Sequence, residues 1–205
     1  MTKKRVGILI SGRGSNMRSL IAAACDPAFP AEIELVVSNV GNAEGLAYAA
    51  AADIPTIVIP HKAYESREDF DRAVDQALVN ADIDIVCLAG FMRILSGWFA
   101  RRWQGRLINI HPSLLPLFKG VHVHEQALHA GVRVSGCTVH FVVPELDAGP
   151  IIAQAAVPVE IDDTAESLAA RVLVQEHRLY PAALKLLAEG RVRLENGHAV
   201  FTSPA

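Results

Sequence analysis

The sequence predicts an α/β fold: an open, mostly parallel Rossmann-like sheet with helices on both faces. Short apolar runs alternate with helix-like segments along the first hundred residues, which is the pattern of a parallel sheet covered on both sides. Two later apolar strands joined by a short acidic turn indicate an antiparallel pair. Asn196-Gly197 lies between two further apolar segments, and this dipeptide is the strongest short signal for a hairpin.

The first strand is expected at residues 5–10, followed by a glycine loop, Ser11–Asn16, and a helix at about 17–24. This arrangement presents backbone N–H groups and a helix N-terminus to an anion. Ser15 or Asn16 is expected to cap the helix. The third glycine of the dinucleotide fingerprint and the Walker lysine are both absent, which favours one phosphate monoester over NAD or ATP. A glycine turn without a ligand is the alternative.

Strands and helices continue to alternate along the chain, and an apolar loop follows the fourth strand. Ala89–Leu95 follows the fourth strand and contains one arginine, Arg93. It could line a pocket for a flat heterocycle, or it could be a buried loop with a capping arginine. Ser66 and Ser96 are placed to begin helices. Strands are expected at 34–38, 56–59 and 85–88, and helices at 43–52, 66–80 and after residue 96.

The central strand, Leu107–His111, alternates so that Asn109 and His111 share one face while Ile108 and Ile110 enter the core. Its carboxyl end is where open α/β sheets place ligands. An amide beside an imidazole suits one kind of chemistry, in which the amide donates to a developing oxyanion and the imidazole moves a proton. A buried polar pair satisfied by the backbone is the alternative.

A long loop follows this strand, then a helix at about 125–130. His122 and His124 in the loop form an HxH pair. No cysteine or paired carboxylate lies near enough in sequence to complete a metal site, so none is expected.

Strands at 134–143 and 151–159 form the antiparallel pair, with Thr138 and His140 on one face. The turn between them contains Asp147. If this turn folds over His111, its carboxylate would hold the imidazole and favour the charged form. Otherwise Asp147 is a solvated turn residue.

Thr164 is expected to cap a long helix whose apolar stripe includes Glu176. A carboxylate on an inward face needs a partner, either a substrate amine or hydroxyl or an arginine such as Arg171. The hairpin at 192–194 and 199–201 is assigned no chemistry.

Composition limits the class of protein. The 205 residues are 51% hydrophobic and 20% charged, with a net charge of −3, which fits one globular domain and not a nucleic-acid-binding surface. Three widely spaced cysteines favour a reducing cytosol over a disulfide framework. The basic and then apolar N-terminus is too short in its apolar part for a signal peptide, and no stretch is long enough to span a membrane.

Together these segments resemble the phosphoribosylglycinamide formyltransferases, the folate-dependent transformylases of purine synthesis. The resemblance covers about residues 5–193, with the motifs in family order. Val123 and Ala148 depart from the family pattern, where a threonine and a glycine are expected. The most specific motifs are SGRGSN (Ser11–Asn16), LAGFMRILS (Leu88–Ser96), INIHPSLLP (Ile108–Pro116), ELDAGPII (Glu145–Ile152) and VQEHRLYP (Val174–Pro181).

The resemblance implies formyl transfer from 10-formyltetrahydrofolate, a co-substrate, with no tightly bound cofactor and no metal. The catalytic residues would be Asn109, His111 and Asp147. The substrate phosphate and ribose would bind Gly14, Ser15, Asn16 and Glu176. The folate would lie along Met92, Arg93, Ile94, Leu95 and Asn109 with help from Arg67, and Ser113, Thr138 and His140 would support the catalytic residues.

One formyltransferase domain is expected over residues 1–205, with a phosphate-binding half to about residue 100 and a formyl-folate-binding and catalytic half after it. The expected partners are small molecules, without nucleic acid or membrane, for a cytoplasmic monomer or homodimer. Two alternatives remain: a formyltetrahydrofolate deformylase, whose usual amino-terminal regulatory domain is not expected here, and a non-catalytic sugar-phosphate-binding protein. A methionyl-tRNA formyltransferase would need a longer chain and a basic surface.

Overall fold

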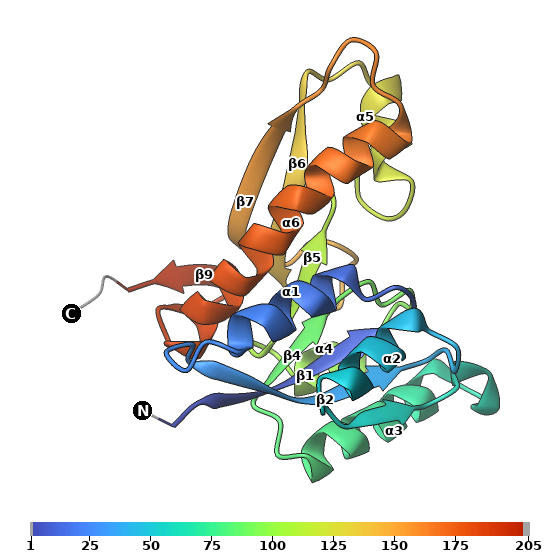
Figure 1. The fold of residues 1–205 in the computed structure, drawn as a ribbon, viewed down its shortest axis with the longest axis vertical. Coiled ribbons are helices and arrows are strands. Elements are labelled where there is room, and N and C mark those ends of the chain that lie inside the picture. The colour runs from blue at the N-terminus through green and yellow to red at the C-terminus, as the bar shows by residue number, and fades with distance from the viewer. Residues whose placement is uncertain (1, 203–205) are drawn as a thin grey trace.

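A seven-stranded sheet organises the chain, and the computed structural model describes residues 2–202 (Figure 1). The strand order is β3-β2-β1-β4-β5-β6-β7. Neighbours from β3 to β5 pair in parallel, whereas β6 is antiparallel to both β5 and β7. This confirms the predicted fold class. The strands are β1 Lys4–Ile10, β2 Ala31–Ser38, β3 Thr56–Val58, β4 Ile85–Leu88, β5 Leu107–His111, β6 Val134–Phe141 and β7 Ile151–Pro158.

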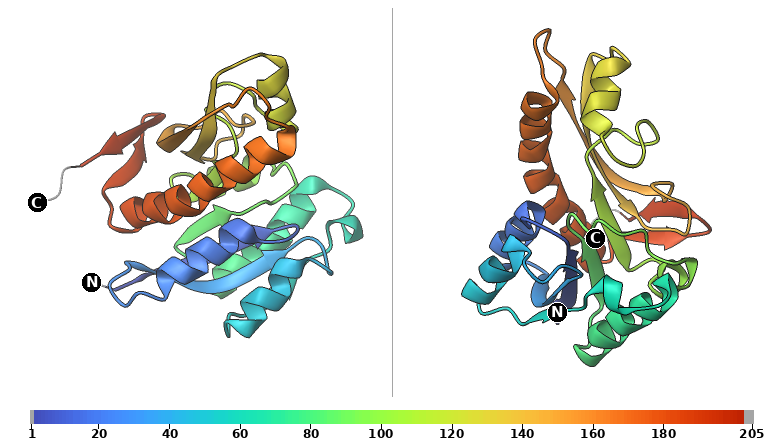
Figure 2. Two further views of the ribbon diagram at one scale, coloured as in Figure 1. Left: turned by 45° about the horizontal axis from the view of Figure 1, so that its top comes forward. Right: turned by 90° about the vertical axis from the view of Figure 1, so that its right-hand side faces the viewer.

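Helices cover both faces of the sheet (Figure 2). Strand β1 shows how the sequence achieves this, because Ile8 and Ile10 belong to one core and Leu9 to the other. One core contains residues of α1 (Ser15–Ala24), α2 (Glu44–Ala51), α5 (Val123–His129) and α6 (Ala165–Ala188). The other contains residues of α3 (Arg67–Asn80) and α4 (Gly97–Arg102), and the 3₁₀ helix η1 is His61–Ala63.

Short polar residues and glycines set the element boundaries as predicted. The hydroxyls of Ser66, Ser96 and Thr164 accept backbone N–H groups at the starts of α3, α4 and α6. Helix α5 ends just before Gly131, which has a φ of 67° that favours glycine. Asn196-Gly197 joins the two strands of the C-terminal hairpin, β8 (Val192–Glu195) and β9 (His198–Phe201).

The sheet topology brings several loops together. Loops that follow β1, β4 and β5 leave from the carboxyl ends of parallel strands and therefore from one edge of the sheet. The β6–β7 turn begins near the start of β5, since Val142 N donates to Leu107 O. To reach the end of β5 this turn must fold back along the strand.

Candidate active site

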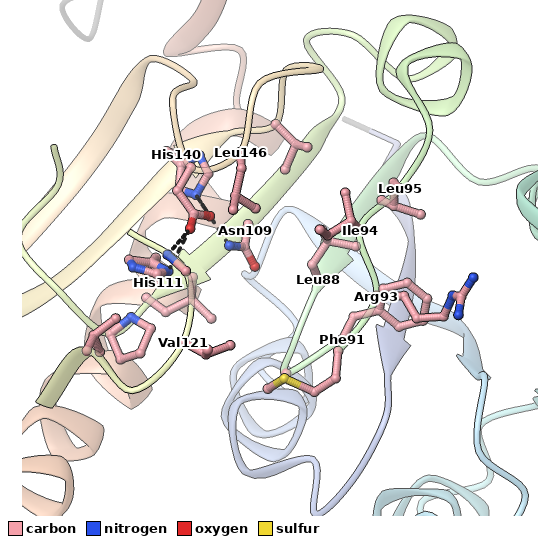
Figure 3. A pocket seen from close by; sticks show the side chains of 18 of the residues that line it. Leu88, Phe91, Arg93, Ile94, Leu95, Asn109, His111, Val121, His140 and Leu146 are labelled. Carbon is pink, nitrogen blue, oxygen red and sulfur yellow. Dashed lines mark hydrogen bonds and ion pairs between the residues drawn. The ribbon is translucent and has the colours of Figure 1, made fainter. Parts of the chain in front are cut away.

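Asn109 and His111 lie on one face of β5, as predicted, and Ile108 and Ile110 are buried in the core behind them. His111 is only 4% exposed, and Asn109 is half-buried. Both side chains line a cavity at the carboxyl edge of the sheet (Figure 3). Strand alternation puts Asn109 and His111 on one face, and the proline after His111 ends the strand there.

Oxygen acceptors face both ring nitrogens of His111. Its Nε2 lies 2.9 Å from the carbonyl oxygen of Phe118, which can only accept, so Nε2 carries a proton. Its Nδ1 lies 3.6 Å from Oδ2 of Asp147. A doubly protonated imidazole satisfies this arrangement, with the carboxylate as its counter-ion.

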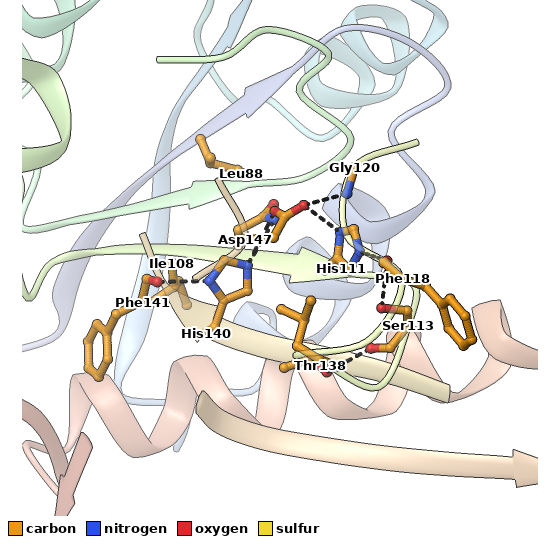
Figure 4. A network of polar contacts seen from close by, with 12 residues as sticks. Leu88, Ile108, His111, Ser113, Phe118, Gly120, Thr138, His140, Phe141 and Asp147 are labelled. Carbon is orange, nitrogen blue, oxygen red and sulfur yellow. Dashed lines mark hydrogen bonds and ion pairs between the residues drawn. The ribbon is translucent and has the colours of Figure 1, made fainter. Parts of the chain in front are cut away.

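The acidic turn does fold over β5, and it places Asp147 between two histidines (Figure 4). Oδ2 of Asp147 also accepts the N–H of Gly120 at 2.9 Å. Its Oδ1 lies 3.9 Å from Nε2 of His140. Asp147 has a φ of 46°, an uncommon conformation for a residue with a side chain. The alternative of a solvated turn residue is wrong, because the side chain is only 9% exposed.

His140 orients the amide of Asn109. The two residues face each other across β5 and β6, with Nδ2 of Asn109 3.3 Å from Nε2 of His140. Nδ1 of His140 donates to Phe141 O at 2.8 Å, so in the neutral ring Nε2 is the acceptor. Burial lowers the pKa of His140, which favours this neutral form. One N–H of the amide remains for another acceptor.

Ser113 and Thr138 act on His111 through the loop after β5 (Figure 4). The hydroxyl of Thr138 donates to Ser113 O at 2.7 Å and accepts the N–H of Leu115 at 3.0 Å. The hydroxyl of Ser113 donates to Leu117 O at 2.7 Å. These bonds hold the loop that supplies the Phe118 carbonyl to His111, and neither hydroxyl lines the cavity.

The cavity beside this centre has a volume of about 640 Å³ and a mainly apolar lining. The loop after β4 forms one wall, including the predicted Met92, Arg93, Ile94 and Leu95. The guanidinium of Arg93 points away from His111 (Figure 3) and lies over the ring of Phe70. A flat heterocycle would therefore meet apolar side chains and backbone groups of this loop.

A second cavity, of about 320 Å³, is lined by the glycine loop Ser11–Asn16 and by Ala89, Gly90 and Met92. Gly14, with a φ of 70°, is the N-cap of α1, and no side chain caps this helix. The prediction that Ser15 or Asn16 caps it is wrong, because the left-handed turn at Gly14 makes Ser15 the first helical residue. The first N–H groups of α1 are left without a side-chain cap, as an anion site requires.

Glu176 lies beside this second cavity. It is 6% exposed, and its Oε2 accepts Nδ2 of Asn16 at 2.6 Å. Burial raises the pKa of this carboxyl group. A pairing with Arg171 is wrong, because Arg171 binds Asp163 instead. The buried carboxylate thus contacts the glycine-loop cavity through Asn16 and does not itself line it.

Comparison with known proteins identifies the family, since the formyl transferase family matches residues 4–184. The chain belongs to the formyl transferase family. It is 44% identical over 192 residues to the phosphoribosylglycinamide formyltransferase of Escherichia coli, covering 94% of this chain and 91% of that protein. A glycinamide ribonucleotide transformylase structure from Symbiobacterium toebii superposes with a TM-score of 0.95 at 43% identity, covering 98% of this chain and 95% of that one. The predicted resemblance is therefore confirmed.

A trifunctional purine biosynthetic protein from Bos taurus is 56% identical over 202 residues. These residues are 98% of this chain and 20% of that protein. The chain thus spans about a fifth of the length of this relative.

Some lining residues of this formyl transferase were not singled out from the sequence. Val121 and Leu146 reach the large cavity from the loop before α5 and from the acidic turn (Figure 3). The available signal in the sequence was an apolar residue inside a loop. In the structure Val121 is 68% exposed and Leu146 is 52% exposed. Arg67, which the resemblance assigned to the folate, is exposed at the first turn of α3 and does not line the cavity.

The histidines after β5 lie at the same cavity. His122 is exposed and pairs with Glu125, whereas Nδ1 of His124 is buried and has no hydrogen-bond partner among the described residues. Burial lowers the pKa of His124. Within residues 2–202, no group of three or more His, Cys, Asp or Glu side chains is arranged to hold a metal ion. In the same range, no helix is long and apolar enough to cross a membrane.

Proposed function

We propose that this chain transfers the formyl group of 10-formyltetrahydrofolate to the amine of N1-(5-phospho-D-ribosyl)glycinamide, giving the N-formyl product and tetrahydrofolate in de novo purine synthesis. One observation carries the proposal. Asn109, His111 and Asp147 converge on an apolar cavity that adjoins a second, glycine-loop cavity through Gly90 and Met92. A transfer between two bound small molecules needs this arrangement.

The chemistry follows from the side chains. The substrate amine attacks the formyl carbon, and the carbonyl oxygen becomes an oxyanion. The free N–H of Asn109 donates to that oxyanion. The positive charge of the protonated His111 ring stabilises the oxyanion electrostatically, since both ring N–H groups face Phe118 O and Asp147. Asp147 holds the imidazolium and, with a water, carries the amine proton to the folate nitrogen that leaves. The amine is already a competent nucleophile, so no covalent intermediate is required.

Binding follows the two cavities. The phosphate would bind the N–H groups of Gly14, Ser15 and Asn16, with the ribose on Glu176. The folate heterocycle would lie along residues 92–95 and Asn109, and Arg67 would meet the acidic end of the folate outside the cavity. Because the folate wall comes from residues before and after 100, the two proposed halves share the active site.

Small molecules would be the partners of a monomer or homodimer in the cytoplasm. All three cysteines are free, with Cys25 exposed, which supports a reducing compartment.

A single assay tests the proposed function against its rivals. Purified protein is mixed with 10-formyltetrahydrofolate, with and without glycinamide ribonucleotide, and loss of the formyl-folate is followed. Loss only with the ribonucleotide supports the transferase. Formate release without it would indicate a deformylase, and binding without turnover would indicate a sugar-phosphate-binding protein.

A further inference from the structure

The two cavities share the short segment after β4. Gly90 and Met92 line both of them. Met92 is 73% exposed, so packing of its side chain does little to fix the segment. Something else must hold the backbone between the cavities.

Ser11, the first residue of the glycine loop, makes the bonds that hold this segment. Its backbone N–H donates to Gly90 O at 3.2 Å. Its hydroxyl accepts the N–H of Met92 at 2.8 Å. One residue of the phosphate cavity therefore fixes two backbone groups of the folate wall.

Two further polar side chains, Asn39 and His61, orient the Ser11 hydroxyl. This hydroxyl donates to Oδ1 of Asn39 at 2.6 Å, and Asn39 is only 4% exposed. Nδ2 of Asn39 lies 3.1 Å from Nδ1 of His61, which accepts in one tautomer. Because the single proton of the hydroxyl is directed to Asn39, its lone pairs are left to face Met92.

We propose that the Ser11 hydroxyl is a positioning group that couples the occupancy of the two cavities. The inference rests on the proposed function and adds a role for a residue outside the formyl-transfer chemistry. A phosphate bound to the glycine loop restricts Ser11, and Ser11 then restricts the backbone at Met92 against which the folate lies. The second ligand meets a wall that is already ordered. By linkage, folate must strengthen phosphate-ligand binding by the same factor.

Calorimetric titration of the full chain tests the coupling. Glycinamide ribonucleotide is titrated with and without saturating tetrahydrofolate, and then the order is reversed. We expect a coupling factor within the usual range of about 5–150-fold for the wild type. Ser11→Ala should bring it close to one, and Ser11→Thr, which keeps the hydroxyl, should restore it. A merely structural role in the turn would not produce this rescue.

Two further variants make the result decisive. Ser167→Ala removes a hydroxyl that likewise accepts one backbone N–H, from Thr164, and donates to one side chain, Asp163. It lies at the start of α6, away from the residues that line either cavity, and this variant should keep the wild-type coupling. Ser11→Cys fills nearly the same space with a weak acceptor, and it replaces Ser11→Ala if that variant does not fold. Wild-type coupling in Ser11→Ala or Ser11→Cys, or independent binding in the wild type, would overturn the inference alone. A wild type that binds neither ligand would overturn the proposed function with it.

Discussion

Asp147 contacts two imidazoles that have different hydrogen-bond partners. Its carboxylate lies 3.6 Å from His111 Nδ1 and 3.9 Å from His140 Nε2. Burial lowers the pKa of His140, and a backbone carbonyl accepts its Nδ1–H. The carboxylate can therefore act as counter-ion to His111 while His140 stays neutral and holds Asn109. One turn residue thus orients the other two members of the proposed catalytic set, His111 directly and Asn109 through His140.

Removing either member of the ion pair should abolish most turnover without unfolding the protein. We expect His111→Ala and Asp147→Ala each to lower kcat by at least about 10²–10³, the cost typical of losing one group that stabilises an oxyanion, because Asp147 holds the charged form of His111. Steady-state kinetics measures the loss, and circular dichroism melting checks the fold. His198→Ala, on the exposed β9 strand, is the matched control and should keep full activity. Near-normal kcat in soluble Asp147→Ala would exclude the assigned role.

The ionised carboxylate of Glu176 should lower the free energy of unfolding at neutral pH while it strengthens binding of the ribonucleotide. Its pKa is raised by burial, so between pH 4.5 and its folded-state pKa the unfolded chain binds fewer protons than the folded chain. Stability therefore falls as pH rises through that window. Glu176→Gln has no charge to desolvate and should be more stable at neutral pH by on the order of 1 kcal/mol, while binding the ribonucleotide more weakly.

Urea unfolding of both proteins from pH 4 to 8 measures this difference. The gain from Glu176→Gln should shrink below pH 4.5, where the carboxyl group is protonated in both states. A gain that is independent of pH would show that desolvation is not its cause.

The sequence could predict residues whose placement depends on local periodicity. Alternation alone placed Asn109 and His111 on one face, and the apolar stripe showed that Glu176 needs a partner. The identity of that partner could not be predicted from α6. Asn16 lies 160 positions away, and the packing of α1 against α6 brings it close.

At the scale of elements, α6 depends on its first turn. Thr164 and Ser167 form a capping box in which each hydroxyl accepts the other's backbone N–H. Arg171 binds Asp163 just before the cap. The sequence predicted the start of this helix correctly because capping is a local interaction. The start of β2 was predicted at residue 34, whereas the strand begins at Ala31. Where a strand begins depends on pairing with its neighbour, which a local pattern does not show.

Loss of the cap should destabilise the protein without affecting catalysis. Thr164→Ala removes the acceptor for the Ser167 N–H, and the typical cost is about 1 kcal/mol. Urea unfolding measures the difference, and turnover should be unchanged because Thr164 lines neither cavity. Thr164→Ser keeps the hydroxyl and should lie close to the wild type. Equal destabilisation by both substitutions would point to packing instead.

For the whole molecule, α6 connects the parallel and antiparallel parts of the sheet. It packs on α1 and on β6 and β7. Tyr180 of this helix is fully buried, and its hydroxyl lies 2.9 Å from Leu88 O and 3.2 Å from Ile108 O. Those carbonyls belong to β4 and β5, directly before the loop that lines the large cavity and before Asn109. A single buried hydroxyl thus joins the helix to both strands that support the site.

Tyr180→Phe should therefore lower the free energy of unfolding of the whole molecule, which should still unfold in one cooperative step. The substitution keeps the ring in the core and leaves two buried carbonyl groups without this donor, at a cost of about 1 kcal/mol. We expect a lower urea midpoint with an unchanged slope, because the surface exposed on unfolding is the same. Tyr64→Phe is the control, since the hydroxyl of Tyr64 makes no hydrogen bond to residues 2–202. A midpoint as high as that of Tyr64→Phe would mean that the bonds of Tyr180 contribute nothing to joining the two parts of the sheet.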